Sequence, residues 1–225
     1  MSSKEWKTYK IGDLCLKITS GGTPNTRKSE YYGGEIPWLK TQEVNFNRIY
    51  NTETFINNEG LMNSSAKWIP IDSVIVAMYG VTAGKLAVNK IPLTTNQACC
   101  NLVIDRSKAD YNFIYYNLLS RFSEIAGMAV GGAQQNLNAG MIRELEILIP
   151  NIHIQKNISS ILSSLDDKIE LNRQTNQTLE GIAQTLFQEM CVPKGDELPE
   201  GWRVGKLGEV YKTTSGGTPS RAKME

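Results

Sequence analysis

The stretch from Ile152 to Met190 carries an apolar repeat that constrains the fold more than any other feature of the sequence. Its apolar residues return at alternating steps of four and three, which is the spacing of one face of a long helix. Pro150 and Pro193 flank the stretch and confine the helix to the residues between them. About forty residues at about 1.5 Å each make a rod of roughly 60 Å. The preceding body of about 150 residues is too small to cover such a rod.

The seven-residue spacing along this face is that of a coiled coil. Two asparagines occupy the centre of the seam, where buried amides lower stability but fix the register of pairing. We expect the seam to pair with a second helix, from a repeat or from another subunit, and not only with its own domain. The predicted seam consists of Ile158, Leu162, Leu165, Ile169, Asn172, Asn176, Leu179, Ala183, Leu186 and Met190.

The composition is that of one globular domain with an extension. The chain has 225 residues, of which 40% are hydrophobic and 21% charged, so it can bury a sizeable core. No apolar run reaches transmembrane length and no signal segment follows Met1, which predicts a cytoplasmic protein with no membrane contact. The four cysteines show no metal-binding spacing, and we expect reduced thiols that are mostly buried.

The formal net charge of +1 neither suggests nor excludes a nucleic-acid partner. Residues 1–150 carry a slight excess of basic over acidic side chains, whereas residues 151–191 carry the opposite. Any polyanion should therefore contact the first part of the chain. Binding to DNA would require local clustering of cations or help from a more basic partner.

Residues 1–150 are predicted to form an α+β fold, a globular mixed α/β domain that precedes the long helix. Residues 43–72 are rich in asparagine and show little periodicity, which indicates loops. One amphipathic helix is expected over residues 112–126, because an apolar stripe at steps of three is typical of a core-facing helix. The stripe consists of Phe113, Tyr116, Leu119 and Phe122. Short strands are predicted within residues 9–20, 36–42, 73–79, 85–88, 98–104 and 146–149.

A glycine-rich turn after the first strands is the first candidate for a DNA contact. Two glycines let the backbone approach another surface closely, and a proline fixes the exit. Arg27 and Lys28 follow immediately, and exposed amides beside two cations suit contact with phosphates. An ordinary hairpin turn is the simpler interpretation of this loop alone. The candidate residues are Ser20, Gly21, Gly22 and Thr23.

Further candidates come from strand ends and amide-rich loops. Asparagine and glutamine can pair two hydrogen bonds with the major-groove edge of adenine, although in loops they more often cap turns. The loop over residues 130–139 holds four amides and no charge, which favours an adjustable recognition surface. The candidates are Lys40, Thr41 and Gln42 at one strand end, Lys85 after a second turn, Asn96 and Gln97 before a strand, and Gln134, Gln135 and Asn136 in the loop.

The sequence contains no recognisable catalytic constellation. The turn from Gly80 to Gly84 has too short a spacing for a phosphate-binding loop, and Leu86 stands where a magnesium-binding Ser or Thr is required. The signature typical of amino-methyltransferases is absent. His153 is the one histidine and has no acid or nucleophile cluster beside it, so a capping or surface role is favoured. We therefore expect a protein that is not an enzyme.

The sequence at the start of the chain is repeated after the long helix. Trp202-Arg203 mirrors Trp6-Lys7, Leu207 to Val210 mirrors Ile11 to Leu14, and Thr214 to Pro219 repeats Thr19 to Pro24 letter for letter. A period this long indicates a duplicated domain. The predicted organisation is therefore a globular domain over residues 1–150, a spacer helix over 151–192 and the start of a second globular domain over 193–225.

These motifs together resemble the specificity subunit of Type I restriction-modification systems, and the resemblance covers essentially the whole chain. It rests on the opening repeat, on Ile36 to Lys40, Val74 to Met78, Gly80 to Lys85 and Thr94 to Gln97, and on Leu165 to Asn172. The resemblance implies target-recognition domains that each read half of a split site in double-stranded DNA. It also implies spacer helices that pair antiparallel and dock adenine-N6 methyltransferase subunits. S-adenosylmethionine and catalysis would come from those subunits, with no cofactor in this chain, and a restriction or translocase subunit can join.

The chain departs from this family pattern in length. Either it is a fragment of a longer protein, or it is a half-subunit of which two copies associate through the helices about a twofold axis. Such a homodimer would read an inverted, interrupted repeat. A stand-alone DNA-binding or regulatory module without a methyltransferase is the alternative, and it predicts tight specific binding by the chain alone. The residues after the helix can complete the edge of either domain by strand pairing.

Overall fold

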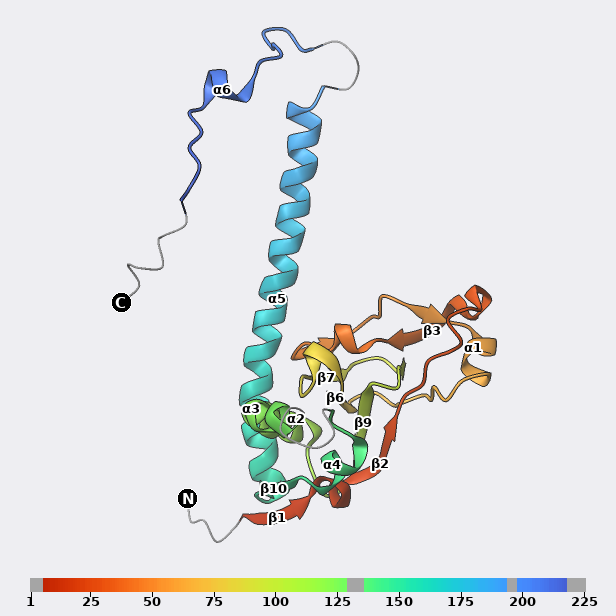
Figure 1. Ribbon diagram of the computed structural model, residues 1–225. Helices are drawn as coiled ribbons and strands as arrows, with labels where there is room; N and C mark the ends of the chain where they lie inside the picture. The colour runs from red at the N-terminus through yellow and green to blue at the C-terminus, as the bar shows by residue number, and fades with distance from the viewer. Residues whose placement is uncertain (1–5, 129–135, 194–197, 218–225) are drawn as a thin grey trace. The chain divides into compact units, whose positions relative to one another are not determined.

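The computed structural model describes residues 6–128, 136–193 and 198–217 (Figure 1). The chain forms two units, residues 1–168 and residues 169–225. The boundary lies inside the long helix α5 (Ile152–Cys191), because the first turns of this helix pack on the globular part. We call residues 6–150 the body. Its mixed sheets and helices, followed by the long helix, confirm the predicted fold class.

A five-stranded sheet forms the centre of the body. Its strand order is β2-β9-β6-β7-β4, and neighbouring strands are antiparallel except for the pair β4 and β7. The two middle strands are buried at every position because both faces of the sheet are covered, which explains their continuous apolar sequences. The hairpin predicted from residues 73–88 is confirmed as β6 paired with β7. The strands are β2 (Cys15–Ser20), β4 (Asn47–Ile49), β6 (Val74–Ala77), β7 (Leu86–Asn89) and β9 (Cys99–Ile104).

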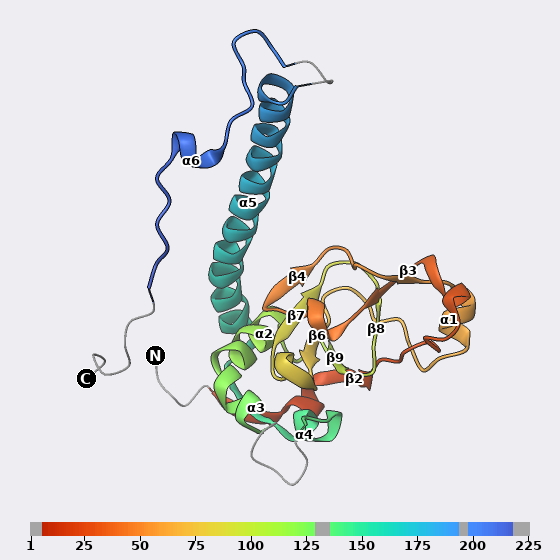
Figure 2. The ribbon, with the colours of Figure 1, turned by 45° about the horizontal axis from the view of Figure 1, so that its top comes forward.

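A second sheet and three helices cover the two faces of this centre (Figure 2). The second sheet has the order β5-β3-β8, with β5 (Phe55–Ile56), β3 (Tyr32–Leu39) and β8 (Thr94–Thr95). The helices α2 (Tyr111–Ser120), α3 (Phe122–Met128) and α4 (Ala139–Glu144) contribute to the largest apolar core. Helix α1 (Asn58–Met62) packs beside β3, within the stretch that we predicted to be loops.

Strand β1 (Lys7–Lys10) pairs with β10 (Glu146–Ile149) in a two-stranded antiparallel ribbon. The predicted strands at both ends of the body are therefore confirmed. Between β1 and β2 the chain makes a short 3-10 helix, Ile11–Leu14, whose two apolar side chains are fully buried. Three other 3-10 helices occupy Ser29–Tyr31, Thr41–Glu43 and Gly80–Thr82.

The single helix predicted over residues 112–126 is wrong. The structure has two helices, and the break falls at Arg121, whose guanidinium binds the carbonyl of Glu146 and the carboxylate of Glu124. The predicted stripe is confirmed in part, since Phe113 is buried and Tyr116 and Leu119 pack half-buried against the same core. It is incomplete, because steps of three drift around a helix of 3.6 residues per turn. The side chains of α2 that are buried are Phe113, Ile114, Tyr115 and Leu118.

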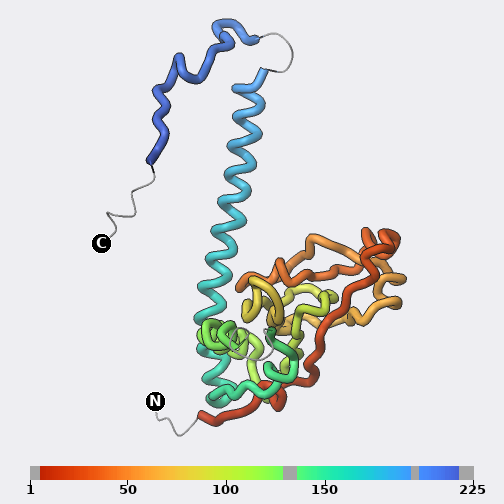
Figure 3. The backbone as a smooth tube through the Cα atoms, viewed as in Figure 1, coloured from red at the N-terminus to blue at the C-terminus, as the bar shows by residue number. Residues whose placement is uncertain are grey.

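Helix α5 confirms the predicted long helix, with 40 residues between the two flanking prolines. The first turns of this helix lie beside the body (Figure 3), and side-chain hydrogen bonds fasten them to it. Gln155 Oε1 accepts from the Asp110 amide at 3.0 Å, and Ser159 Oγ donates to Asp110 Oδ1 at 2.6 Å. Ile158 packs against the largest core of the body, so it stabilises its own domain and lies outside the seam in which we predicted it.

The remaining apolar face of α5 is uncovered in the described chain. Leu162 is half-buried, whereas the later predicted seam residues are exposed. Leu165, Leu179 and Leu186 each expose more than half of their surface, and Met190 exposes 77%. None of the described helices combines the length and apolar character that a membrane span requires.

A buried arginine makes a further contact between the body and α5. The Arg48 guanidinium lies 4.4 Å from the centre of the Tyr115 ring and donates to Tyr116 Oη at 3.0 Å. Tyr116 Oη in turn donates to Asp166 Oδ2 at 2.7 Å. Burial, followed by the bond to Asp166, raises the pKa of Tyr116, which keeps this donor protonated. We call these three residues, Arg48, Tyr116 and Asp166, the clasp.

We predict that Arg48→Met lowers the free energy of unfolding by about 2 kcal/mol, because the clasp loses a buried charged donor while the packing volume is kept. Arg106→Met is the matched control, since Arg106 pairs with Asp72 at the surface and such pairs contribute about 0.2 to 1 kcal/mol. Urea unfolding followed by circular dichroism measures both. Equal effects of the two substitutions would contradict a structural role for the clasp.

Candidate nucleic-acid interface

Four loops meet at one end of the five-stranded sheet. Strands β2 and β6 finish at this end, whereas β9, β7 and β4 begin there. The connecting segments therefore converge although they are far apart in sequence. We call them the loop end of the body, which comprises residues 20–23, 40–46, 79–85 and 96–98. Most of the residues predicted to contact DNA lie here.

Hydrogen bonds join these loops to one another. Thr41 Oγ1 donates to Asn96 Oδ1 at 2.8 Å, and Thr23 Oγ1 donates to Gln97 Oε1. Thr41 is buried, so it stabilises the loop over residues 96–98 and cannot reach a base. The side-chain oxygen of Asn96 already accepts from Thr41 Oγ1 and Cys99 Sγ, which favours a role in joining the loops over contact with a base. Gln42 and Gln97 are exposed and keep amide groups that can reach a ligand.

The glycine turn has a different role from either one that we predicted. The amides of Gly21 and Gly22 donate to the carbonyls of Cys99 and Thr95, so they are not exposed for phosphate contact. A hairpin is also wrong, because β2 and β3 belong to different sheets. A Cβ on Gly21 would overlap the Thr95 carbonyl, and one on Gly22 would overlap the backbone of Ala66. The two glycines therefore let this segment pack against its own body.

The sequence reasoning missed a cleft of about 300 Å³ at the loop end. Tyr79 exposes 39% of its surface there, and Val81 is fully exposed. An exposed aromatic and an exposed aliphatic side chain beside polar groups suit contact with base edges and thymine methyl groups. In the sequence, the signal that could have indicated this cleft is a buried strand that runs directly into an exposed apolar turn. The cleft is lined by Thr41, Gln42, Tyr79, Gly80, Val81, Thr82, Asn96 and Ala98.

Two lysines give the loop end positive charge. Lys85 Nζ binds Asn45 Oδ1 at 2.8 Å and lies over the Phe46 ring, so its position is defined. Lys40 is half-buried at the end of β3. Its neighbour Glu43 accepts hydrogen bonds from the backbone amides of Lys40 and Glu53, and this local use of the carboxylate reduces its repulsion of a phosphate.

The other predicted cations and amides are placed elsewhere. Arg27 and Lys28 lie on the second sheet's side of the body, where Lys28 Nζ donates to Tyr31 Oη at 3.0 Å next to α1. Gln134 and Gln135 fall outside the described residues. Asn136 is exposed, and the amide of the following Leu137 donates to the Met78 carbonyl at 3.1 Å, which brings this segment to the loop end.

Comparison with known proteins identifies the family. Residues 3–181 match the family model described as the Type I restriction modification DNA specificity domain. The chain belongs to this family.

Individual relatives agree with the assignment of the specificity domain. The MjaIX specificity subunit of Methanocaldococcus jannaschii is 29% identical over 95% of this chain and 53% of its own length. The HindI specificity subunit of Haemophilus influenzae is 31% identical over 76% of this chain and 38% of its own length. A crystal structure of the S subunit from M. genitalium superposes with a TM-score of 0.63 at 16% identity, over 82% of this chain and 45% of that one. The specificity domain described here therefore spans about half the length of the relatives it matches.

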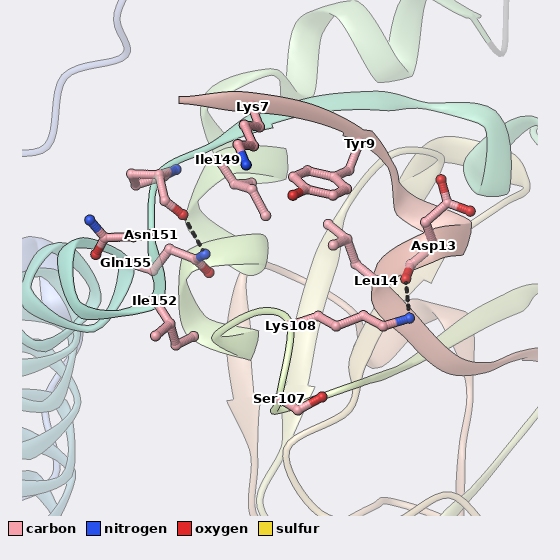
Figure 4. Close-up of a pocket in the computed structure, with 11 residues that line it drawn as sticks. Lys7, Tyr9, Asp13, Leu14, Ser107, Lys108, Ile149, Asn151, Ile152 and Gln155 are labelled. Carbon is pink, nitrogen blue, oxygen red and sulfur yellow. Dashed lines mark hydrogen bonds between the residues drawn. The ribbon is translucent and has the colours of Figure 1, made fainter. Parts of the chain in front are cut away.

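A cavity of about 610 Å³ in this specificity domain lies away from the loop end. It is formed where the β1–β10 ribbon meets the first turn of α5 (Figure 4). Two of its polar side chains make hydrogen bonds within the chain. Gln155 Nε2 donates to the Pro150 carbonyl, and Lys108 Nζ donates to the Asp13 carbonyl. The cavity therefore belongs to the contact between ribbon and helix.

The prediction of mostly buried thiols is confirmed for two of the four cysteines. All four are free, Cys99 and Cys100 are buried, and Cys15 and Cys191 are half-buried. Burial raises the pKa of both thiols to about 12, which makes them poor nucleophiles and poor metal ligands at neutral pH. Within the described ranges, no group of three or more His, Cys, Asp or Glu side chains could hold a metal ion.

We predict that Gly22→Ala lowers the free energy of unfolding by about 2 kcal/mol or more, because the methyl group would overlap the backbone of Ala66. Gly127→Ala in α3 is the matched control. Its Cβ would meet no atom, and alanine favours a helix by about 1 kcal/mol, so this substitution should not destabilise the chain. Urea titrations distinguish the two, and a Gly22→Ala variant as stable as the parent would contradict the close approach.

Proposed function

We propose that this chain is the DNA sequence-recognition subunit of a Type I restriction-modification complex, reading one half of a bipartite site. It would direct adenine-N6 methyltransferase subunits, with their own S-adenosylmethionine, and a restriction subunit to that site. The family match over residues 3–181 carries the proposal, since it includes both the loop end and most of α5.

The loop end supplies the chemistry that base reading needs. Gln42 presents an exposed amide that can accept from adenine N6 while it donates to N7. Gln97 is also exposed, but its Oε1 already accepts from Thr23 Oγ1, so it offers its Nε2 as a donor. Lys40 and Lys85 flank them and can neutralise phosphates. Because the chain as a whole is nearly neutral, this local charge is modest. Stable binding to DNA would therefore depend on the methyltransferase partners.

Helix α5 supplies the surface for a second copy. Its exposed seam keeps a seven-residue spacing beyond the clasp, and Asn172 and Asn176 at its centre would set the register of two paired helices. Ile161 and Ile182 are also exposed, and each directly precedes a seam residue. The apolar face is thus wider than two paired helices require, and the remainder suits the docking of a methyltransferase.

We predict that the chain is a dimer in size-exclusion chromatography with light scattering at micromolar concentration. Leu179→Asp combined with Leu186→Asp should give monomers, because two charges would be buried in the seam. Gln177→Asp combined with Gln184→Asp is the control, since these positions have the same spacing on the opposite face of α5. A parent chain that is monomeric, or a control that dissociates equally, would exclude pairing through the seam.

The reading function is tested by co-expression with adenine-N6 methyltransferase subunits of a Type I system, followed by mapping of methylated adenines on genomic DNA. Gln42→Ala or Gln97→Ala should relax one position of the methylated motif, since a direct base contact contributes about 1 to 3 kcal/mol of discrimination. Lys40→Gln should reduce methylation of all sites uniformly. Gln177→Ala, on α5, is the control. A motif that is unchanged by both loop-end glutamine substitutions would overturn this placement.

A further inference from the structure

The segment after α5 repeats the start of the body in conformation as well as in sequence. We call residues 6–22 the resident segment and residues 202–217 the repeat segment. The 3-10 helix Ile11–Leu14 lies between extended residues Lys10 (ψ 144°) and Cys15 (ψ 138°). The short helix α6 (Leu207–Val210) lies between extended residues Lys206 (ψ 141°) and Tyr211 (ψ 139°). Both segments thus have an extended, helical and extended course.

The repeat segment keeps the apolar side chains and the glycines of the resident segment, although only the resident segment packs them against the body. Ile11 and Leu14 are fully buried, whereas their counterparts Leu207 and Val210 each expose more than two thirds of their surface. Gly21 and Gly22 are required by close approach to the body, whereas a Cβ on Gly216 or Gly217 would meet no atom within 4 Å. The repeat segment is therefore fitted to a surface that it does not contact within its own unit.

The one difference in spacing between the two segments supports the same conclusion. The repeat segment is one residue shorter between its helical turn and its Thr-Ser-Gly-Gly motif. In the resident segment, β2 has a bulge between Cys15 and Lys17, where the pairing with β9 skips Leu16. Leu16 is 70% exposed and contributes little to the core. Without it, Tyr211 to Ser215 can pair with Ile104 to Cys100 in an uninterrupted ladder.

We propose that the repeat segment of one copy can replace the resident segment on the body of a second copy. Its first residues would pair with β10, Leu207 and Val210 would enter the core, and Gly216-Gly217 would pack against the residues around Thr95. The exchange rests on the proposed pairing of two copies, but it needs neither DNA nor a methyltransferase, so it is tested separately from sequence reading. The resident segment is covalently attached and competes with the incoming one, so exchange is favoured when the two copies are already held together.

A disulfide trap between two differently labelled full-length chains tests the exchange. In the body, Thr8 is paired with Leu148, and the counterpart of Thr8 in the repeat segment is Val204. An isotope-labelled chain with Leu148→Cys is mixed with an unlabelled chain with Val204→Cys, both also carrying Cys191→Ser. Mild oxidation with oxidised glutathione should join position 148 of one chain to position 204 of the other, as read by peptide mass spectrometry.

Matched variants separate strand exchange from random collision. Met62 is 83% exposed on α1, so a chain with Met62→Cys in place of Leu148→Cys measures collision alone. Gly216→Val in the donating chain should reduce the 148–204 link about tenfold, because the added side chain would overlap the receiving backbone. Gly21→Val in the receiving chain should raise the link by destabilising the resident segment. A link no stronger than the Met62→Cys control, or unchanged by Gly216→Val, would overturn the proposal.

Discussion

The contact between the body and the first turns of α5 is the constraint on which the rest of the structure depends. Asp110 caps α2 and at the same time binds Gln155 and Ser159, so one carboxylate residue fixes where the long helix begins. The clasp extends this contact as far as Asp166. Beyond it, the body provides no further cover for the apolar seam. Since exposed apolar surface is unfavourable in water, the exposed seam over residues 169–190 supports the proposed pairing with a second helix.

The two ends of the central sheet have separate roles. Strand β9 begins among the loops that carry Gln97, and it ends at Ile104, shortly before the Asp110 cap that receives α5. A buried sheet with close-packed faces is a stiff element. The loop end is therefore held at a fixed distance from the first turns of α5. Because the two regions lie at opposite ends of β9, substitutions in the loops can alter the proposed DNA contacts without disturbing the helix contact.

The sequence predicted the features that depend on local periodicity. The limits of α5, the β6–β7 hairpin and strands β9 and β10 follow from spacing and flanking prolines, and all are present. Features that depend on distant contacts were not predictable. The break at Arg121 reflects a bond to the carbonyl of Glu146, and the clasp joins three separate elements. The spacing of Tyr116 resembles that of a core residue, and only Arg48 and Asp166 show that it serves a polar contact.

The glycine turn shows why a motif can be recognised in the sequence and still be assigned the wrong role. Its two glycines predict close approach of the backbone, and close approach is what the structure shows. The approaching surface is the loop before β9, and not a phosphate, because pairing of β2 with β9 carries the turn past Thr95. Once this partner is known, the identical glycines after α5 acquire a meaning that the sequence alone could not give them. They fit the same surface, which is the surface that we propose a second copy of the chain offers.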